Sequence, residues 1–176
     1  FVVATGSSAA VPPIPGLDGV PFLTNESVFD RDALPHHLIV IGGGPIGVEM
    51  AQAHAQLGCT VTLLEMFSIM ANDDGDLVGV VRRALTAGGI DIREGIKIAS
   101  VEKTAAGVAV NIEEGGETQR VEGSHLLVAA GRRANVAGLD LEKAGIDHTP
   151  KGITVDARLR STNKKVFAIG DVAGGL

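Results

Sequence analysis

The sequence predicts an α/β fold in which helices pack on a parallel sheet, with an antiparallel meander added to it. Three observations support this prediction. An apolar run at 38–41 leads through a glycine-rich turn into a helical apolar pattern and a second apolar run at 60–64. Apolar residues then alternate along the segments between 96 and 123, as in antiparallel strands. Further apolar runs at 126–130 and 166–169 each end at a glycine.

The composition is that of a globular protein. Hydrophobic residues make up 45% and charged residues 20% of the 176 residues, which excludes wholesale disorder. The net charge of −6 and the lack of a basic block argue against nucleic acid or an anionic membrane as a partner. No apolar run reaches the ~18 residues of a transmembrane helix and no signal peptide is visible, so we expect a cytoplasmic protein.

The N-terminal part is expected to be a strand followed by a surface connection. The apolar residues before Gly6 suit a buried strand that ends in a tight turn. Prolines at 12, 13, 15, 21 and 35 rule out a long helix or a central strand in residues 9–35.

Residues 38–65 predict a β-α-β unit with a right-handed crossover and parallel strands. The four consecutive apolar residues at 38–41 are typical of a strand buried on both faces. One apolar helix face follows, formed by Ile46, Met50, Ala53 and Leu57. Gly58 then takes the position of a C-terminal cap, and the second strand ends at Glu65.

The remaining elements follow in order. A helix starts at Asp73-Asp74 and stops at Gly88-Gly89, and a third parallel strand covers 90–93. The meander at 96–123 has a turn at 113–116. The other expected elements are a buried strand at 126–130, a short helix around 139–144, a half-exposed strand at 153–155 and a buried strand at 166–169.

The motif Gly42-x-Gly44-x-x-Gly47 lies between the first strand and the first helix of the β-α-β unit. Gly42 allows the tight turn, Gly44 lets the backbone approach a pyrophosphate, and Gly47 lets helix and strand pack closely. The phosphates would meet unpaired N–H groups at the positive end of the helix. In this context the motif predicts a Rossmann-like dinucleotide site, with a ligand-free glycine turn as the alternative.

Glu65 stands at the end of the second strand, where a carboxylate can accept hydrogen bonds from both adenosine ribose hydroxyls. The same carboxylate would repel a 2′-phosphate, and residues 65–71 contain no cation. Arg82 and Arg83 lie further on, in the next helix. The sequence therefore predicts NAD as the cofactor in preference to NADP. A solvated acid at a strand end is the alternative.

Four ordered motifs give the chain a family resemblance. They are Ala4-Thr5-Gly6-Ser7, the run from Gly42 to Glu49, Ala130-Gly131-Arg132-Arg133-Ala134-Asn135, and Val166-Phe-Ala-Ile-Gly-Asp-Val-Ala-Gly-Gly175. In these motifs the chain resembles the central part of the FAD- and NAD-linked (pyridine nucleotide-disulfide) oxidoreductases, which include dihydrolipoamide dehydrogenase and mercuric reductase. Such enzymes act on lipoamide, mercuric ion or oxygen, and the four motifs do not distinguish among these substrates.

The resemblance implies a domain map. Residues 1–30 would be a crossing strand and linker of a split FAD domain, 31–137 the NAD-binding domain, and 138–176 the return to the FAD domain. The family's FAD fingerprint and redox cysteine pair would lie upstream, and its dimerisation domain downstream. We therefore expect this chain to be a segment of a homodimeric flavoenzyme. The segment by itself would contain no catalytic residue and would be inactive. In the intact enzyme, hydride would pass between NAD(H) and FAD.

The resemblance also assigns site residues. The NAD set is Gly42, Gly44, Pro45, Ile46, Gly47, Glu49, Glu65, Ile98 and Gly131, with Ile98 at the adenine and Glu49 near the nicotinamide. The FAD set is Gly6, Gly170 and Asp171, with Asp171 bonding the ribityl chain. Pro45 stands where some relatives carry a Tyr over the flavin, so no aromatic gate is expected.

A non-catalytic NADH-sensing module of the same fold is the alternative function. A sensor has no need of the Ile169-Gly170-Asp171 motif, which favours the enzyme. Cys59 has no partner cysteine, and neither the pair His36-His37 nor His54 has a second ligand at metal spacing, so no metal site is expected.

Overall fold

The structure, a computed structural model, describes residues 1–174, so Gly175, the last residue of the fourth motif, lies outside the described part. The chain forms two compact units, which are described separately. The larger unit is Val11–Gly131, and the smaller unit combines Phe1–Ala10 with the chain from Arg132 onward. These limits differ from the expected 1–30, 31–137 and 138–176, and the assignment of FAD and NAD domains stays a prediction.

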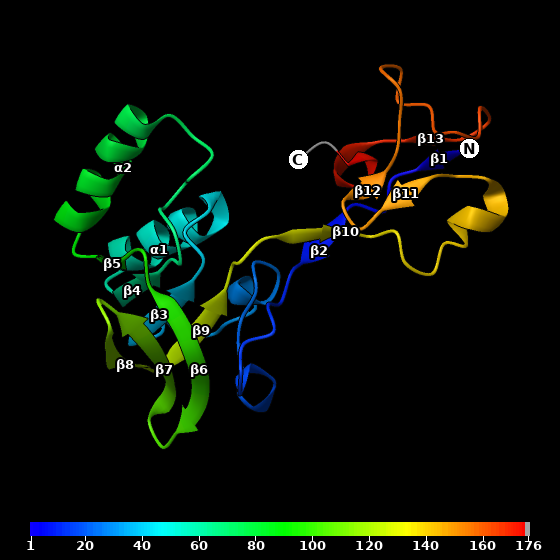
Figure 1. The fold of residues 1–176 in the computed structure, drawn as a ribbon. Coiled ribbons are helices and arrows are strands. Elements are labelled where there is room, and N and C mark those ends of the chain that lie inside the picture. The colour runs from blue at the N-terminus through cyan, green and yellow to red at the C-terminus, as the bar shows by residue number, and fades with distance from the viewer. Residues whose placement is uncertain (175–176) are drawn as a thin grey trace. The chain divides into compact units, whose positions relative to one another are not determined.

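A four-stranded sheet forms the centre of the larger unit (Figure 1). Its strands are β3 (His37–Ile41), β4 (Thr60–Leu64), β5 (Asp91–Arg93) and β9 (His125–Val128). They pair in the order β5-β4-β3-β9, and every pairing is parallel. The predicted parallel sheet is confirmed.

Two helices cover one face of this sheet. Helix α1 (Pro45–Gln56) begins with proline at its first position, and Gly58 follows its end with φ +96°. Helix α2 (Gly75–Ala87) is capped by Asp74, whose side chain accepts hydrogen bonds from the Asp76 and Leu77 N–H groups. The buried side chains shared between the sheet and these helices include Leu38, Val40, Val61, Leu63 and Leu127 from the strands and Val48, Ala51, Val78 and Leu85 from the helices.

A three-stranded antiparallel meander covers the other face. It consists of β6 (Lys97–Thr104), β7 (Gly107–Glu114) and β8 (Glu117–Gly123). Side chains of the sheet that alternate with the helix-facing ones, including Ile39, Ile41 and Val128, join the core formed with the meander. Because both faces are covered, the strands read as continuous apolar runs rather than alternating ones.

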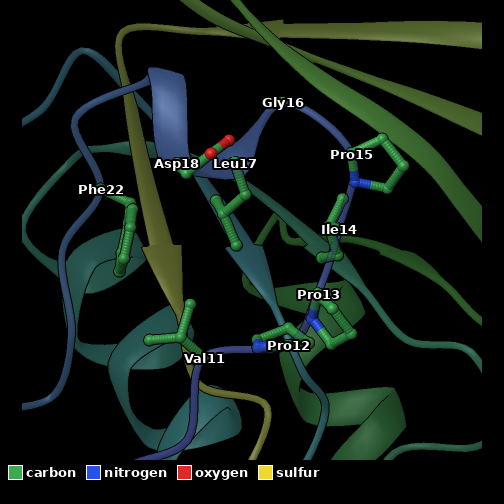
Figure 2. Close-up of a pocket in the computed structure, with 9 residues that line it drawn as sticks. All are labelled: Val11, Pro12, Pro13, Ile14, Pro15, Gly16, Leu17, Asp18 and Phe22. Atoms are coloured by element: carbon green, nitrogen blue, oxygen red, sulfur yellow. The ribbon is translucent and has the colours of Figure 1, made fainter.

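The proline-rich segment is only in part the surface connection that the sequence predicts. Its short 3₁₀ helices η1 (Leu17–Gly19) and η2 (Ser27–Phe29) each bury one apolar side chain, Leu17 and Val28. The Pro15 carbonyl accepts a 2.8 Å hydrogen bond from the Val101 N–H on β6. Residues 11–18 and Phe22 line a largely apolar cavity of about 510 Å³ (Figure 2). Its lining contains no predicted site residue.

The smaller unit contains short strands and 3₁₀ helices around its own core. Its pairs are β1 (Val2–Val3) with β13 (Phe167–Ala168), β2 (Ser7–Ala9) with β10 (Arg132–Ala134), and β11 (His148–Thr149) with β12 (Gly152–Ile153). The 3₁₀ helices are η3 (Leu141–Ala144) and η4 (Gly170–Ala173). The expected strand at 153–155 is shorter and better buried, since Ile153 belongs to the core.

Within residues 1–174, no helix combines the length and the hydropathy that crossing a membrane requires.

Replacing Asp74 with Ala should lower the free energy of unfolding by about 1 kcal/mol, because two N–H groups at the start of α2 lose their acceptor. Urea denaturation followed by circular dichroism measures the loss. Asp73→Ala is the matched control, since that neighbouring carboxylate is exposed and does not cap the helix. Equal losses in the two variants would contradict the capping role.

Candidate functional site

The turn after β3 brings three backbone segments together at Gly42. The Gly42 N–H donates to the Leu64 carbonyl at 2.9 Å. The residue has φ +110°, and a Cβ at this position would lie 2.4 Å from the Ala129 carbonyl oxygen. Position 42 therefore requires glycine for both its conformation and its surroundings.

The other two motif glycines differ sharply in their surroundings. A Cβ at Gly47 would lie 1.8 Å from the Gly42 carbonyl oxygen, so the first turn of α1 packs directly against the turn after β3. A Cβ at Gly44 would meet no described atom within 4 Å, and φ is −71° there. Gly47 is thus required by packing within the protein, whereas Gly44 borders open space.

The start of α1 leaves backbone donors without helical partners. Val48 is the first residue whose N–H donates to a carbonyl of this turn, that of Gly44 at 3.0 Å. The preceding N–H groups of Ile46 and Gly47 therefore have no partner within the helix, and Pro45 has no N–H. Together with the helix dipole, these donors make the end of α1 favourable for an anion.

Glu65 lies at this glycine turn. One carboxylate oxygen accepts the Gly43 N–H at 2.6 Å, and the other accepts the Phe67 N–H at 2.8 Å. A carboxylate oxygen can accept more than one hydrogen bond, so both oxygens retain acceptor capacity. Gly43 belongs to the site because its N–H binds Glu65. The position is also crowded, since a Cβ there would lie 2.8 Å from Ile69 Cγ2. Gly43 is not among the residues predicted from the sequence, because it occupies a variable position of the motif.

The carboxyl end of β3 is a topological switch point. From β3 the chain goes first to β4 on one side, and it later returns as β9 on the other. Such a point is where open α/β sheets bind ligands. The Ala129 N–H donates to the Ile41 carbonyl at 2.8 Å, so the chain after β9 runs beside the turn after β3. Gly131 follows, exposed, with φ +127°.

Two predicted NAD residues, Ile98 and Glu49, make none of the hydrogen bonds described above. Ile98 is on β6, where its partly buried side chain packs against the core between sheet and meander. Glu49 is exposed on α1. Their contacts with a ligand remain predictions.

The predicted FAD residues belong to the smaller unit. The Ser7 hydroxyl donates to Asp171 Oδ2 at 2.5 Å and accepts from Arg132 Nε at 2.6 Å. Gly6 has φ +67°, and its carbonyl accepts the Asn135 N–H at 2.9 Å. Gly170, with φ +71°, begins η4 beside Asp171. The first, third and fourth sequence motifs thus meet, and Ser7 and Arg132 join the site without having been predicted.

Cys59 is buried in the core of the larger unit, beside the start of β4. Burial raises the pKa of its thiol, and a backbone hydrogen bond with Leu38 offsets part of that rise. The described residues contain no group of His, Cys, Asp and Glu side chains that could hold a metal ion.

The sequence pattern of the pyridine nucleotide-disulphide oxidoreductases matches residues 1–176, the whole chain. The chain belongs to this family. Family members are enzymes, so the chain is part of an oxidoreductase family that uses flavin and pyridine nucleotides. The family membership predicted from the four sequence motifs is confirmed.

Relatives within the family are substantially longer than this chain. It is 39% identical to a dihydrolipoyl dehydrogenase from Thermus scotoductus, with 98% of this chain and 38% of the relative covered. It is 34% identical to a mercuric reductase from Streptomyces lividans, with 98% and 36% covered. The Cu(II) complex of the HOCl-induced flavoprotein disulfide reductase RclA from Escherichia coli superimposes with a TM-score of 0.91 at 34% identity, covering 99% of this chain and 40% of that one.

Gly47→Ala should cost about 3 kcal/mol of unfolding free energy, because two rigid backbone segments would have to separate to admit the new methyl group. Gly44→Ala should cost less than about 1 kcal/mol, since its methyl group projects into open space. Urea denaturation of both variants checks the difference. Equal costs would contradict the close contact between Gly47 and Gly42.

Cys59 should react with a disulfide reagent such as DTNB at least about tenfold more slowly in the folded chain than in urea. The thiolate is the reactive species, and burial both raises the pKa of the thiol and blocks access to it. Absorbance at neutral pH follows the reaction. Equal rates in the folded and unfolded chains would show that the thiol is accessible.

Proposed function

We propose that the unit Val11–Gly131 binds NAD(H) and presents it to FAD within a flavin-dependent pyridine nucleotide-disulfide oxidoreductase resembling dihydrolipoamide dehydrogenase. The observation on which this proposal rests is the hydrogen bond from the Gly43 N–H to the Glu65 carboxylate. It joins the acid at the end of β4 to the glycine turn at the end of β3. A dinucleotide needs both features, an anion site for its pyrophosphate and an acceptor for its ribose.

The pyrophosphate would lie over Gly44 and the first turn of α1. Open space around Gly44 and the N–H groups of Ile46 and Gly47, which have no partner within the helix, support this placement. Pro45 restricts the backbone at the first helical position without using a donor. The residues present therefore fit the diphosphate part of the cofactor.

The two hydroxyls of the adenosine ribose would donate hydrogen bonds to the Glu65 carboxylate. The Gly43 and Phe67 N–H groups already hold both carboxylate oxygens, so the acceptor is oriented before the ligand arrives. A 2′-phosphate would place like charge beside this carboxylate. The proposed roles of Ile98 at the adenine, Gly131 against the dinucleotide and Glu49 near the nicotinamide complete the NAD site.

FAD would meet the smaller unit at Gly6, Gly170 and Asp171. The Ser7 hydroxyl and the Arg132 guanidinium orient the Asp171 carboxylate, which would accept hydrogen bonds from hydroxyls of the flavin side chain. The two bound cofactors would exchange a hydride between nicotinamide and flavin. The part of this chain is to bind and orient them, in a parent enzyme that we propose to be a homodimer. Membership in a family of enzymes favours this function over a non-catalytic NADH sensor.

The 176-residue chain should bind NADH at least tenfold more tightly than NADPH. Hydrogen bonds to a charged group contribute about 1.5–3 kcal/mol, and NADPH would replace one of them with repulsion. Isothermal titration calorimetry with both nucleotides measures the ratio of their dissociation constants. Equal or tighter NADPH binding would overturn the role of Glu65.

Two variants separate the ribose contact from general damage. Glu65→Gln should narrow the ratio mainly by weakening NADH, because the amide keeps the shape but loses the charge and one of the two acceptor oxygens. Gly44→Ala should weaken both nucleotides alike, since both carry the same pyrophosphate. A Gly44→Ala variant with unchanged affinity for both would contradict the proposed position of the pyrophosphate.

A further inference from the structure

A second carboxylate, Glu94, holds the segment that follows Glu65. This segment, 66–70, leaves the end of β4 and exposes the side chains of Met66 and Phe67. Glu94 lies just after β5, and its Oε1 accepts the Ile69 N–H at 2.8 Å. The neighbouring Gly95 N–H donates to the Phe67 carbonyl at 2.9 Å. Two hydrogen bonds therefore hold segment 66–70 against the residues that follow β5.

Arg82 on α2 forms a bidentate salt bridge with Glu94. Its Nε donates to Glu94 Oε2 at 2.8 Å, and its Nη2 donates to Oε1 at 2.7 Å. This contact lowers the pKa of the Glu94 carboxyl, burial opposes the shift, and the Ile69 N–H adds to it. The side chains are 36% and 26% exposed, so the pair is partly shielded from water. Glu94 is thus an ordered anion.

The peptide that Glu94 holds lies directly against the glycine turn. Ile69 is wholly buried, and its Cγ2 would be 2.8 Å from a Cβ at Gly43. The next N–H, that of Met70, donates to the Gly43 carbonyl at 2.8 Å. Gly43 in turn donates its own N–H to Glu65. A continuous set of contacts therefore runs from Arg82 through Glu94, Ile69 and Gly43 to Glu65.

We propose that Glu94, fixed by Arg82, is a positioning residue for the ribose site: it holds the Ile69 peptide against Gly43 and so keeps the Glu65 carboxylate oriented for the adenosine ribose. The proposal rests on the proposed function of Glu65. Glu94 itself need not touch the nucleotide. Its effect on binding passes through Glu65, and this distinguishes positioning from direct contact.

A double-mutant cycle tests this dependence by calorimetry with NADH on the 176-residue chain. Glu94→Ala should weaken NADH about tenfold when Glu65 is present, but less than about twofold in the Glu65→Gln background. Arg82→Gln should give a smaller loss than Glu94→Ala, because Glu94 still accepts the Ile69 N–H. Glu122→Ala is the matched control, since it breaks another Arg–Glu pair, with Arg120 on β8, and should leave NADH affinity unchanged.

Hydrogen exchange at the Ile69 amide gives a readout independent of the nucleotide. Glu94→Ala should speed this exchange at least about tenfold, and Glu94→Gln, which keeps an acceptor oxygen and the side-chain volume, should speed it less. If Glu94→Ala fails to fold, Glu94→Gln takes its place in the cycle, where the same dependence on Glu65 is expected with a smaller loss.

The outcomes separate this proposal from the one on which it rests. If the wild-type chain shows no preference for NADH over NADPH, the role of Glu65 itself fails. If the preference is present but the Glu94 variant binds NADH as the wild type does, only the positioning role is overturned. Equal losses from the Glu94 substitution in both backgrounds would likewise overturn it, because they would show an effect that does not pass through Glu65.

Discussion

The close approach of two backbone segments, the turn at Gly42 and the first turn of α1 at Gly47, is the constraint on which the larger unit depends. A methyl group at either glycine would reach a carbonyl oxygen at less than any normal contact distance. The approach places the start of α1 directly beyond β3 and lets the helix lie close on the sheet. The same short stretch therefore serves packing and also contains the helix N–H groups to which we assign the pyrophosphate.

The sheet distributes its side chains between two different covers. Alternate residues of β3 face the helices through Leu38 and Val40, and the meander through Ile39 and Ile41. A strand with two covered faces has no polar side in its sequence. Thr62 on β4 is a buried polar residue beside β3, where its hydroxyl contacts the His37 ring, whereas Glu65 stands beyond the end of β4. The proposed dinucleotide site is at the carboxyl ends of the strands, because both faces of the sheet are covered.

Local sequence patterns were enough to predict the parallel strands, both helices and the meander, because each is coded within about a dozen neighbouring residues. The packing of residues 11–35 was not predicted, because its contacts are distant in sequence, as between Pro15 and Val101. Gly42 and Gly47 had the local roles expected of them. Gly43 and Ser7 were missed because one occupies a variable motif position and the other gains its role only when Arg132 and Asp171 arrive from far along the chain.

The pairing of β1 with β13 and of β2 with β10 affects the order in which the two units can fold. Val2 pairs with Phe167, and Ser8 pairs with Arg133, so the smaller unit needs two segments that lie on either side of residues 11–131 in the sequence. On the ribosome, residues 11–131 emerge complete while β1 and β2 still lack their partners. The larger unit is therefore free to fold first, and its folding shortens the effective loop that the two ends must close. Until synthesis reaches β13, β1 lacks the partner strand with which it pairs in this structure.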